Sequence, residues 1–250
     1  MRFLLYNIRY GAGIGRRFHL PVPYSGYFKR TNGNLNKIVD FIKSVNPDII
    51  GLIEVDSGSY RSEKTNQAEV IGRKMKHHYV YHSKYPTNSM AQKIPVVNKQ
   101  GNAILTNREI KSKKLHYFRK GVKRLVIELE LEEFTIFLVH LSLKFRHRHH
   151  QLQELHAMVK DVKRPVIVAG DFNALWGDRE LEFFLAATGL KNANGQGQPS
   201  YPSRFPVRQL DYIFCSAGIK VTGFQAPAVR LSDHMPLICD FEVSASTNST

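Results

Sequence analysis

Short apolar runs, each close to a polar residue, recur along the whole chain. They occupy residues 3–6, 49–53, 103–105, 125–129, 134–139, 166–169, 212–214 and 237–241. Runs of this length are typical of strands buried in the core of a sheet. Two further segments, residues 35–45 and 152–162, repeat apolar residues with the spacing of a helix. A third helix is expected at residues 179–188, because Gly189 suits the left-handed residue that ends many helices.

The order of these elements decides the expected fold class. Strands and helices alternate along much of the chain, as in α/β proteins. The stretch LVIELELEEFTIFLVHL, residues 125–141, instead predicts two strands joined by a tight turn at Glu132 and Glu133. Together these patterns predict an α/β protein with mixed sheets. No internal repeat or shift in composition divides the chain, so we expect one domain over residues 1–243 and a flexible tail over residues 244–250.

The chain is strongly basic. It has 36 Lys and Arg residues against 21 Asp and Glu residues, a formal net charge of +15. Because such a charge concentrates anions near the surface, we expect an anionic partner such as a nucleic acid, a phospholipid headgroup or a small phosphorylated compound. Cys215 and Cys239 lie in apolar runs, where free cysteine behaves as a small buried hydrophobe, so no disulfide framework is expected.

No targeting segment is evident in the sequence. The apolar stretch near Met1 is too short for a secretory signal and no small-residue cleavage site follows it. No stretch approaches the roughly 20 apolar residues of a membrane span. We therefore expect a soluble, cytoplasmic monomer, and peripheral contact with an anionic membrane stays open.

Polar residues stand repeatedly where the expected strands end. Those with useful chemistry are Asn7, Glu54, His140, Asp171, Asn173, Asp211, Asp233 and His234. Each alone has an ordinary explanation, because polar residues often cap the turn beside a strand. Strand ends that converge on one edge of an α/β sheet, however, form the usual ligand crevice. We expect Gly170 to release the chain where the sheet ends, so that Asp171 faces this crevice.

Hard oxygen donors among these residues suit a divalent cation. The carboxylates of Glu54 and Asp233 and the amide of Asn7 are ligands for Mg²⁺ or Mn²⁺, which also keep water molecules and bind phosphate oxygens. Two cysteines are too few for a thiolate-rich zinc site. We therefore expect Mg²⁺ or Mn²⁺ as the cofactor.

The other residues suit proton transfer during hydrolysis of a phosphoester. Asp211 and His234 can pair so that the carboxylate fixes the tautomer and favours the charged ring. Asp171 can orient or deprotonate a water molecule, and Asn173 can donate to a phosphoryl oxygen. The residues themselves therefore predict a hydrolytic enzyme.

Six motifs carry these residues in a fixed order between Asn7 and His234. They are GLIEVD with Glu54, GNAILT from Gly101, VHLSL with His140, GDFNAL with Asp171, LDYIF with Asp211, and LSDHMPL with His234. The combination of GDFN, LDYIF and SDH in this order is specific. It resembles the endonuclease/exonuclease/phosphatase superfamily, which includes nucleases, sphingomyelinases and inositol polyphosphate phosphatases.

The resemblance implies a four-layer sandwich, in which two stacked mixed sheets are flanked by helices on both outer faces. It also implies that Glu54 is the main metal ligand, with Asn7 beside it. Asp233 would contribute directly or through water.

The resemblance assigns roles to the remaining site residues. His234, held by Asp211, would face the scissile phosphate and either activate water or stabilise the charged transition state. Asp171 and Asn173 would complete the site, and His140 would lie near the leaving group. The implied reaction is in-line attack of water on a phosphoester, with the metal neutralising the developing charge.

The substrate is less constrained, because this superfamily shares a site and varies the rim around it. His140 stands where exonuclease III-like repair enzymes usually carry a tyrosine motif, and secreted DNase I-like enzymes normally have a signal and disulfides. We therefore expect a phosphodiesterase that acts on a phospholipid headgroup or a small phosphoester. A DNA or RNA nuclease with the same catalytic residues is the alternative, and a non-catalytic anion-binding protein is a third reading.

Residues in loops and motifs around the site are candidates for substrate contact. The individual candidates are Asn102, Arg146, Arg204 and Arg208. Arg146 belongs to the basic run KFRHRHH, residues 144–150, which is either a solvated loop with a first helical turn or a rim that contacts phosphate. Residues 15–30 interleave cations with aromatic rings, which suits base stacking, a membrane interface or packing on the core.

Overall fold

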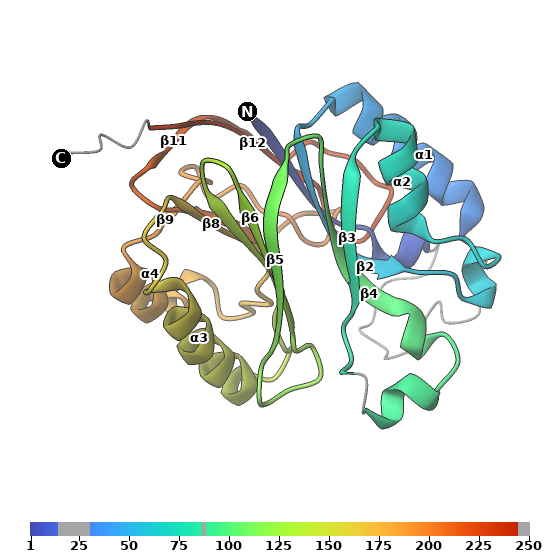
Figure 1. The fold of residues 1–250 in the computed structure, drawn as a ribbon, viewed down its shortest axis with the longest axis horizontal. Helices are drawn as coiled ribbons and strands as arrows, with labels where there is room; N and C mark the ends of the chain where they lie inside the picture. Colours follow the sequence, from blue (N-terminus) through green and yellow to red (C-terminus); the bar gives the residue numbers. More distant parts are fainter. Residues whose placement is uncertain (15–30, 87–88, 245–250) are drawn as a thin grey trace.

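The computed structural model describes residues 1–14, 31–86 and 89–244. The stretch at residues 15–30 and most of the expected tail lie outside the described residues. Within the described ranges the chain forms two six-stranded sheets that stack on each other (Figure 1). The first sheet has the strand order β11-β12-β1-β2-β4-β3, and the second has the order β5-β6-β7-β8-β10-β9.

Both sheets are mixed, as the sequence predicts. The strands of the first sheet are β1 (Arg2–Asn7), β2 (Ile49–Asp56), β3 (His78–Ser83), β4 (Gln100–Thr106), β11 (Ile219–Gln225) and β12 (Leu237–Val243). Those of the second are β5 (Ile110–Tyr117), β6 (Leu125–Leu131), β7 (Thr135–His140), β8 (Val166–Asp171), β9 (Lys191–Asn192) and β10 (Asp211–Cys215). The pairs β1–β2 and β7–β8 are parallel. The other pairs in the described residues are antiparallel.

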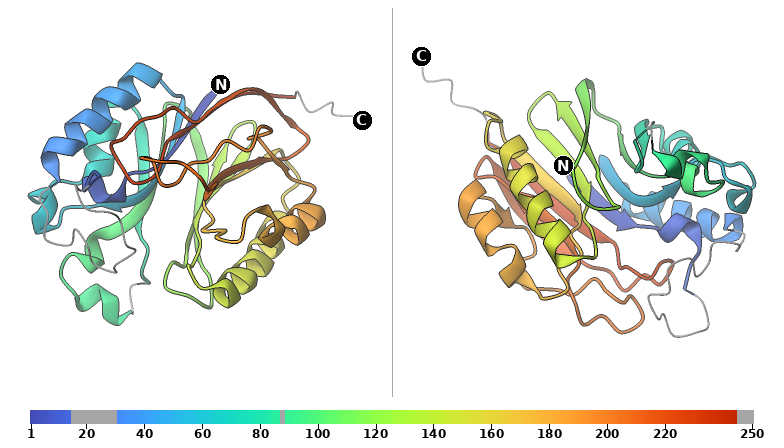
Figure 2. Two further views of the ribbon diagram at one scale, coloured as in Figure 1. Left: turned by 180° about the vertical axis from the view of Figure 1, so that it is seen from behind. Right: turned by 90° about the horizontal axis from the view of Figure 1, so that it is seen from below.

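Helices cover the outer faces of the two sheets, so the expected four-layer sandwich is confirmed (Figures 1 and 2). They are α1 (Asn32–Val45) and α2 (Gln67–Met75) on the first sheet, and α3 (Phe145–Val159) and α4 (Glu182–Thr188) on the second. Alternation along β1 shows how the layers form. Phe3 and Leu5 pack in the core between the sheets, whereas Leu4 and Tyr6 pack with residues of α1. A strand covered on both faces is apolar throughout, which explains its continuous apolar run.

The strands that the apolar runs do not predict are β3, β5, β9 and β11. Each of them lies at an edge of its sheet. An edge strand has neighbours on one side only, and charged residues protect its open side. β5, with the sequence IKSKKLHY, is accordingly half exposed, and its pattern is too polar to stand out in a basic chain. Helix α2 is also absent from the sequence prediction.

The predicted helices form with shifted ends. α3 begins at Phe145 and stops at Val159, so residues 145–150 of the basic run form its first turns and Lys144 precedes it, which extends the expected first helical turn. The helix predicted for residues 179–188 is divided between a short 3₁₀ helix, η5 (Asp178–Glu180), and α4. α4 ends as predicted at Gly189, which has a φ of 68°.

The prediction that Gly170 releases the chain from the sheet is wrong. β8 continues through Asp171, which pairs with His140 on one side and Asp211 on the other. Gly170 has a φ of 151°, and a Cβ added there would overlap the carbonyl oxygen of Val139. Glycine is therefore required because two strands approach closely at this point.

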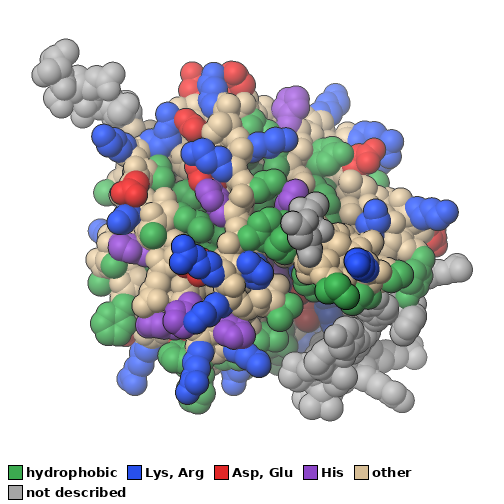
Figure 3. Space-filling view, turned by 60° about the horizontal axis from the view of Figure 1, so that its bottom comes forward, with side chains coloured by type: hydrophobic (Ala, Val, Ile, Leu, Met, Phe, Trp, Pro, Cys, Tyr) green, Lys and Arg blue, Asp and Glu red, His purple; other side chains and the backbone are tan. Residues whose placement is uncertain are grey.

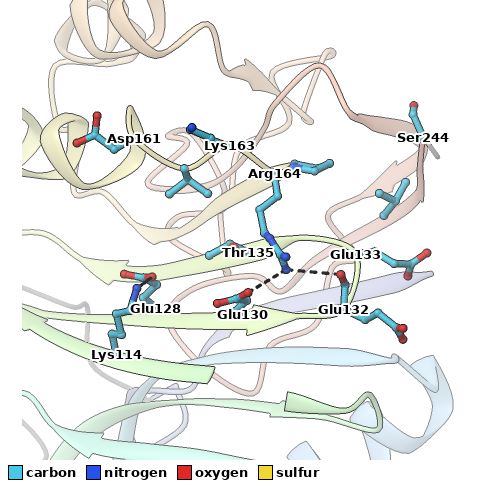
Figure 4. Close-up of a pocket in the computed structure, with 13 residues that line it drawn as sticks. Lys114, Glu128, Glu130, Glu132, Glu133, Thr135, Asp161, Lys163, Arg164 and Ser244 are labelled. Atoms are coloured by element: carbon cyan, nitrogen blue, oxygen red, sulfur yellow. Dashed lines mark hydrogen bonds and ion pairs between the residues drawn. The ribbon is translucent and has the colours of Figure 1, made fainter. Parts of the chain in front are cut away.

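The acidic turn between β6 and β7 forms as predicted, closed by a hydrogen bond from the backbone N–H of Leu131 to the carbonyl of Phe134 at 3.0 Å. A pocket of about 660 Å³ opens beside this turn (Figure 4). Its charges are already paired in part, because Arg164 lies 3.2 Å from Glu130. This pocket is at the end of β7 and β8 opposite to His140 and Asp171.

Two smaller sequence predictions can also be compared with the structure. Cys215 and Cys239 are buried and free, as expected. Among the described residues, no helix combines the length and apolar content needed to cross a membrane.

Candidate active site

The carboxyl ends of the two parallel strand pairs meet at one edge of the sandwich. β1 and β2 lie in the first sheet, β7 and β8 lie in the second, and β8 contacts both β1 and β2. These strands carry Asn7, Glu54, His140 and Asp171. The side-chain amide of Asn7 donates to Oδ2 of Asp171 at 3.2 Å. This hydrogen bond joins the two sheets at the edge where the sequence places the catalytic residues.

Asp171 lies at the centre of the cluster and is almost fully buried. Its Oδ2 is 3.2 Å from Nε2 of His140 and 3.9 Å from Nε2 of His234. Its Oδ1 accepts a hydrogen bond from the backbone N–H of Asn173 at 3.0 Å. Burial alone would raise the pKa of Asp171, but His140 and His234 outweigh it and hold that pKa well below its ordinary range. Asp171 is therefore an anion that accepts hydrogen bonds from several directions.

His234 is paired with Asp211, as the sequence predicts. Its Nδ1 lies 2.7 Å from Oδ2 of Asp211, and that oxygen also accepts a hydrogen bond from Ser200 at 2.6 Å. Burial would lower the pKa of His234, but the carboxylates of Asp211 and Asp171 raise it to about 10. The ring of Tyr201 covers the imidazole at a centroid distance of 4.9 Å. His234 is thus a buried cation whose Nε2 faces Asp171.

His140 contacts the same carboxylate but is in the opposite protonation state. Its Nε2 lies near both Asp171 and the Nζ of Lys123. Burial, together with the Lys123 ammonium, lowers the pKa of His140 to about 4. The ring is therefore neutral at neutral pH and acts through hydrogen bonds.

The sequence suggested that Glu54 stands at the end of its strand. In the structure Glu54 lies within β2, which continues to Asp56. The pairing of β2 with β4 shifts between Leu52 and Val55, and Glu54 has a φ of 58°. Its backbone N–H donates to Oδ1 of Asn102 at 3.2 Å. Bulges of this kind re-aim a side chain, and here the bulge brings Glu54 to within 3.9 Å of Lys123 at the site.

Two lysines that the sequence patterns do not single out lie at this edge. Lys123, just before β6, contacts both His140 and Glu54. Lys84, just after β3, is buried and donates to the hydroxyl of Tyr10 at 2.8 Å. Burial lowers the pKa of Lys84 to about 8 despite the attraction of Glu54. In the sequence, both lysines are visible as a basic residue beside a strand. This pattern is too common to identify a site residue in a chain with 36 Lys and Arg residues.

Asp233 is tied to the cluster through Arg9. Nε of Arg9 lies 3.5 Å from Oδ2 of Asp233, and the backbone N–H of Arg9 donates to Oδ1 of Asn7 at 3.1 Å. The hydroxyl of Ser232 donates to the other oxygen of Asp233 at 3.2 Å. Asp233 and Asn7 thus lie on either side of one arginine.

The two asparagines are already engaged in part. Nδ2 of Asn173 donates to the carbonyl of Leu141 at 2.9 Å, so only its second N–H can reach a phosphoryl oxygen. Asn102 is buried and uses its Oδ1 to hold the bulge at Glu54. Within the described residues the Nδ2 of Asn102 has no partner. Asn102 therefore positions Glu54 and keeps one buried donor group unused.

The three arginines proposed for substrate contact lie further out. Arg146, Arg204 and Arg208 are all exposed. The backbone of Arg208 pairs with that of Tyr201, which covers His234. The guanidinium of Arg204 lies 5.7 Å from the ring centroid of Phe205. No contact in the described part of the chain joins Arg146 or Arg204 to the catalytic cluster, so their role stays a prediction.

The oxygen donors fit a divalent cation. In the described part of the chain the Glu54 carboxylate accepts no hydrogen bond, and its ion-pair partner Lys123 stays 3.9 Å away. Burial would raise the pKa of Glu54, but Lys123 and other nearby cations lower it overall. Because partly buried carboxylate oxygens normally have partners, an anionic Glu54, one residue after the β2 residue that pairs with Asn7, suits a hard cation.

A second group of side chains could also hold an ion. Asp171, Asp211 and His234 place one ligand atom each within 4.8 Å of one another. Nδ1 of His234, however, is engaged by Asp211, and a protonated imidazole has no lone pair for a metal. The chemistry of the donors therefore fits a cation better on the side of Glu54 and Asn7 than within this hydrogen-bonded group.

Comparisons with known proteins bear on the family and the fold of this chain. A model of the "Endonuclease/Exonuclease/phosphatase family" matches residues 4–234. Among curated proteins, a UPF0294 protein of Yersinia pseudotuberculosis is 35% identical over 95 residues, which cover 37% of this chain. That match spans 35% of the Yersinia protein, about a third of its length.

Two solved structures illustrate the likeness of the fold. An endonuclease/exonuclease/phosphatase from Beutenbergia cavernae has a TM-score of 0.73 and 15% identity, over 97% of this chain and 71% of its own. The human Nocturnin catalytic domain, solved with a bound sulfate anion, has a TM-score of 0.69 and 23% identity, over 98% of this chain and 93% of its own. At these identities the likeness supports the fold, and the chemistry rests on the residues of the cluster.

Proposed function

Because this chain belongs to the endonuclease/exonuclease/phosphatase family, we propose that it is a divalent-metal-dependent phosphodiesterase that hydrolyses a phospholipid headgroup ester or a small phosphoester. One observation carries the proposal. An anionic Asp171 lies 3.9 Å from the Nε2 of a protonated His234, at the edge that also carries Glu54. A proton acceptor for water beside a charged donor for a phosphoryl oxygen is what hydrolysis of a phosphoester requires.

The residues of the cluster divide the work of the reaction. Asp171 orients the attacking water and accepts its proton late, once the forming bond to phosphorus has made that water acidic enough for so weak a base. His234, kept charged by Asp211, donates from Nε2 to the phosphoryl oxygen on which negative charge develops. The second N–H of Asn173 adds a donor to the phosphoryl group. His140, the other imidazole that contacts Asp171, would lie near the leaving group.

Glu54, Asn7 and Asp233 would hold the cation. When bound, it would supply Lewis-acid stabilisation of the charge that builds up on the phosphoryl group. Mg²⁺ or Mn²⁺ is proposed because every donor of this set is a hard oxygen.

The preferred substrate class follows from the side chains next to the cluster. Val122 and Leu143, close to Lys123 and His140 in the chain, are exposed over more than half of their surface. Aliphatic side chains suit acyl chains or small apolar groups and offer no face on which a base can stack. The second candidate is a nuclease, which the stacked pair of Arg204 and Phe205 favours, because bases stack on such groups.

The test compares substrates and cations with the purified protein. Hydrolysis of bis-p-nitrophenyl phosphate, sphingomyelin, lysophospholipid, RNA, and single- and double-stranded DNA is measured with Mg²⁺, Mn²⁺ or EDTA. We expect metal-dependent turnover of the small diester and of at least one lipid. Asp171→Asn and His234→Ala should each lower kcat by about a hundredfold or more, because each removes a group that acts in the transition state.

Three outcomes would contradict parts of this proposal. Turnover that survives EDTA, or that is unchanged in His234→Ala, rules out the mechanism. Cleavage of nucleic acid without cleavage of lipid or small diester replaces the substrate class by the second candidate. Binding of phosphoesters without any turnover indicates a non-catalytic anion-binding protein.

A further inference from the structure

Three apolar and three basic side chains are exposed on two chain segments that flank the catalytic edge. We call them the docking patch: Val122, Leu143, Phe145, Lys120, Lys144 and Arg146. The apolar members are exposed over 65, 55 and 53% of their surface in that order, and the basic members are exposed as well. Neither segment of the patch, residues 119–123 or 143–150, contains an Asp or Glu.

The two segments of the docking patch are held together by Gln151 of α3. Its buried side-chain amide donates to the carbonyls of Lys120 at 2.9 Å and Lys123 at 2.7 Å. Its Oε1 accepts the backbone N–H of Ser142 at 2.9 Å. The connection before β6 and the connection after β7 therefore form one surface, and a preorganised surface loses less conformational freedom on binding.

The docking patch adjoins the catalytic cluster along both segments. Val122 precedes Lys123, which contacts His140 and Glu54. Leu143 lies three residues after His140. Figure 3 shows hydrophobic, His, and Lys and Arg side chains interspersed over the face that is turned forward.

The composition of the docking patch selects between anionic partners. Lysines and aromatic rings beside exposed aliphatic groups suit a membrane interface, where apolar tips enter the acyl boundary and cations meet anionic headgroups. A single-stranded nucleic acid would use Phe145 for stacking but would leave Val122 and Leu143 facing water. The net charge of +15 complements either anion. The two aliphatic residues, Val122 and Leu143, therefore favour the membrane over the nucleic acid.

We propose that the docking patch binds the surface of an anionic phospholipid bilayer and thereby places a lipid headgroup at the catalytic edge. This inference rests on the proposed function, because presenting a headgroup to the catalytic edge is useful only if the protein hydrolyses a lipid. Binding to the bilayer itself is a separate property and can be measured without turnover.

The test is sedimentation of the whole protein with vesicles of phosphatidylcholine alone or of phosphatidylcholine with phosphatidylserine, in EDTA. We expect binding to the anionic vesicles. Leu143→Ser with Phe145→Ser should weaken it by about tenfold or more, because two apolar side chains no longer leave water. Lys120→Gln and Lys144→Gln should each weaken it by about fivefold, as expected for one basic residue near an anionic surface.

Two matched control positions lie outside the docking patch. Phe183 of α4 is exposed over 85% of its surface, and Lys163 is exposed beside the pocket at the opposite end of β8. Phe183→Ser and Lys163→Gln should leave vesicle binding unchanged. The double variant at Leu143 and Phe145 should match the wild type in circular dichroism and in thermal unfolding, which shows that it is folded.

The outcomes separate this inference from the proposed function. Equal vesicle binding by the wild type and the docking-patch variants overturns the inference. So does a wild type that ignores vesicles and binds a single-stranded oligonucleotide through the same residues. Vesicle binding that depends on the patch, without hydrolysis of any phosphoester, supports the inference and refutes the proposed function.

Discussion

At the scale of single residues, two histidines on one carboxylate differ because their other neighbours differ. His234 has a second anion, Asp211, at 2.7 Å and is charged. His140 has the cation Lys123 beside it and is neutral. The sequence identifies both histidines and the pairing of His234 with Asp211. It does not reveal the state of His140, because Lys123 reaches that ring from a different strand connection.

The pairing of His234 predicts how stability depends on pH in EDTA. Its pKa in the folded protein is about 10, against an ordinary value of 6.5. A raised pKa stabilises the fold fully below pH 6.5, and this contribution is lost as the pH rises from 6.5 through 10. Thermal unfolding of the wild type and of His234→Asn is measured across this range.

We expect the stability difference between the two proteins to shrink as the pH rises. The two proteins are compared because Lys84, with a pKa of about 8, titrates in the same pH range in both. Its contribution therefore cancels when one profile is subtracted from the other. Parallel profiles for the wild type and His234→Asn would show that His234 is not held in its charged form.

At the scale of elements, the buried strands are predicted well and their special features are not. β1, β2, β7 and β8 are apolar on both faces, so their runs are visible in the sequence. The bulge that re-aims Glu54 depends on the register between β2 and β4, which no local pattern records. The edge strands stay hidden for the same kind of reason, because their place at the edge is a property of the whole sheet.

Gly170 offers a test of the packing between strands. We expect Gly170→Ala to destabilise the protein by about 3 kcal/mol or more, because the added methyl overlaps the carbonyl of Val139 and the φ of 151° disfavours any side chain. Chemical denaturation measures the free energy of unfolding. Gly195→Ala is the control, since nothing lies within 4 Å of a Cβ there. Equal stability of the two variants would mean that β7 and β8 can separate locally at no cost.

At the scale of the whole molecule, the buried carboxylates of the candidate site lie in a basic protein. The buried carboxylates of Asp171 and Asp211 are surrounded by an excess of cations that gives a net charge of +15. A field of this sign attracts phosphoesters to the protein, and we propose that they bind at the edge that carries Asp171 and Glu54.

This charge predicts a dependence on salt. For bis-p-nitrophenyl phosphate we expect kcat/KM to fall several-fold as sodium chloride rises toward physiological strength, because the Debye length shrinks to about 8 Å. The value of kcat at saturation should change little, since the buried cluster is screened less. Initial rates at fixed pH and fixed Mg²⁺ measure both quantities. A kcat/KM that ignores salt would show that only groups in contact with the substrate attract it.

The sequence by itself determined the class of fold and pointed to the polar residues that gather at one edge of the sandwich, because buried strands and the polar residues around them leave local patterns. Only the tertiary structure decided which groups act on one another. Asn7 and Asp171 are 164 positions apart and share a hydrogen bond, and Lys123 meets Glu54 across the two sheets. Protonation states, the aim of Glu54 and the docking patch all depend on such distances, which arise when the sheets stack.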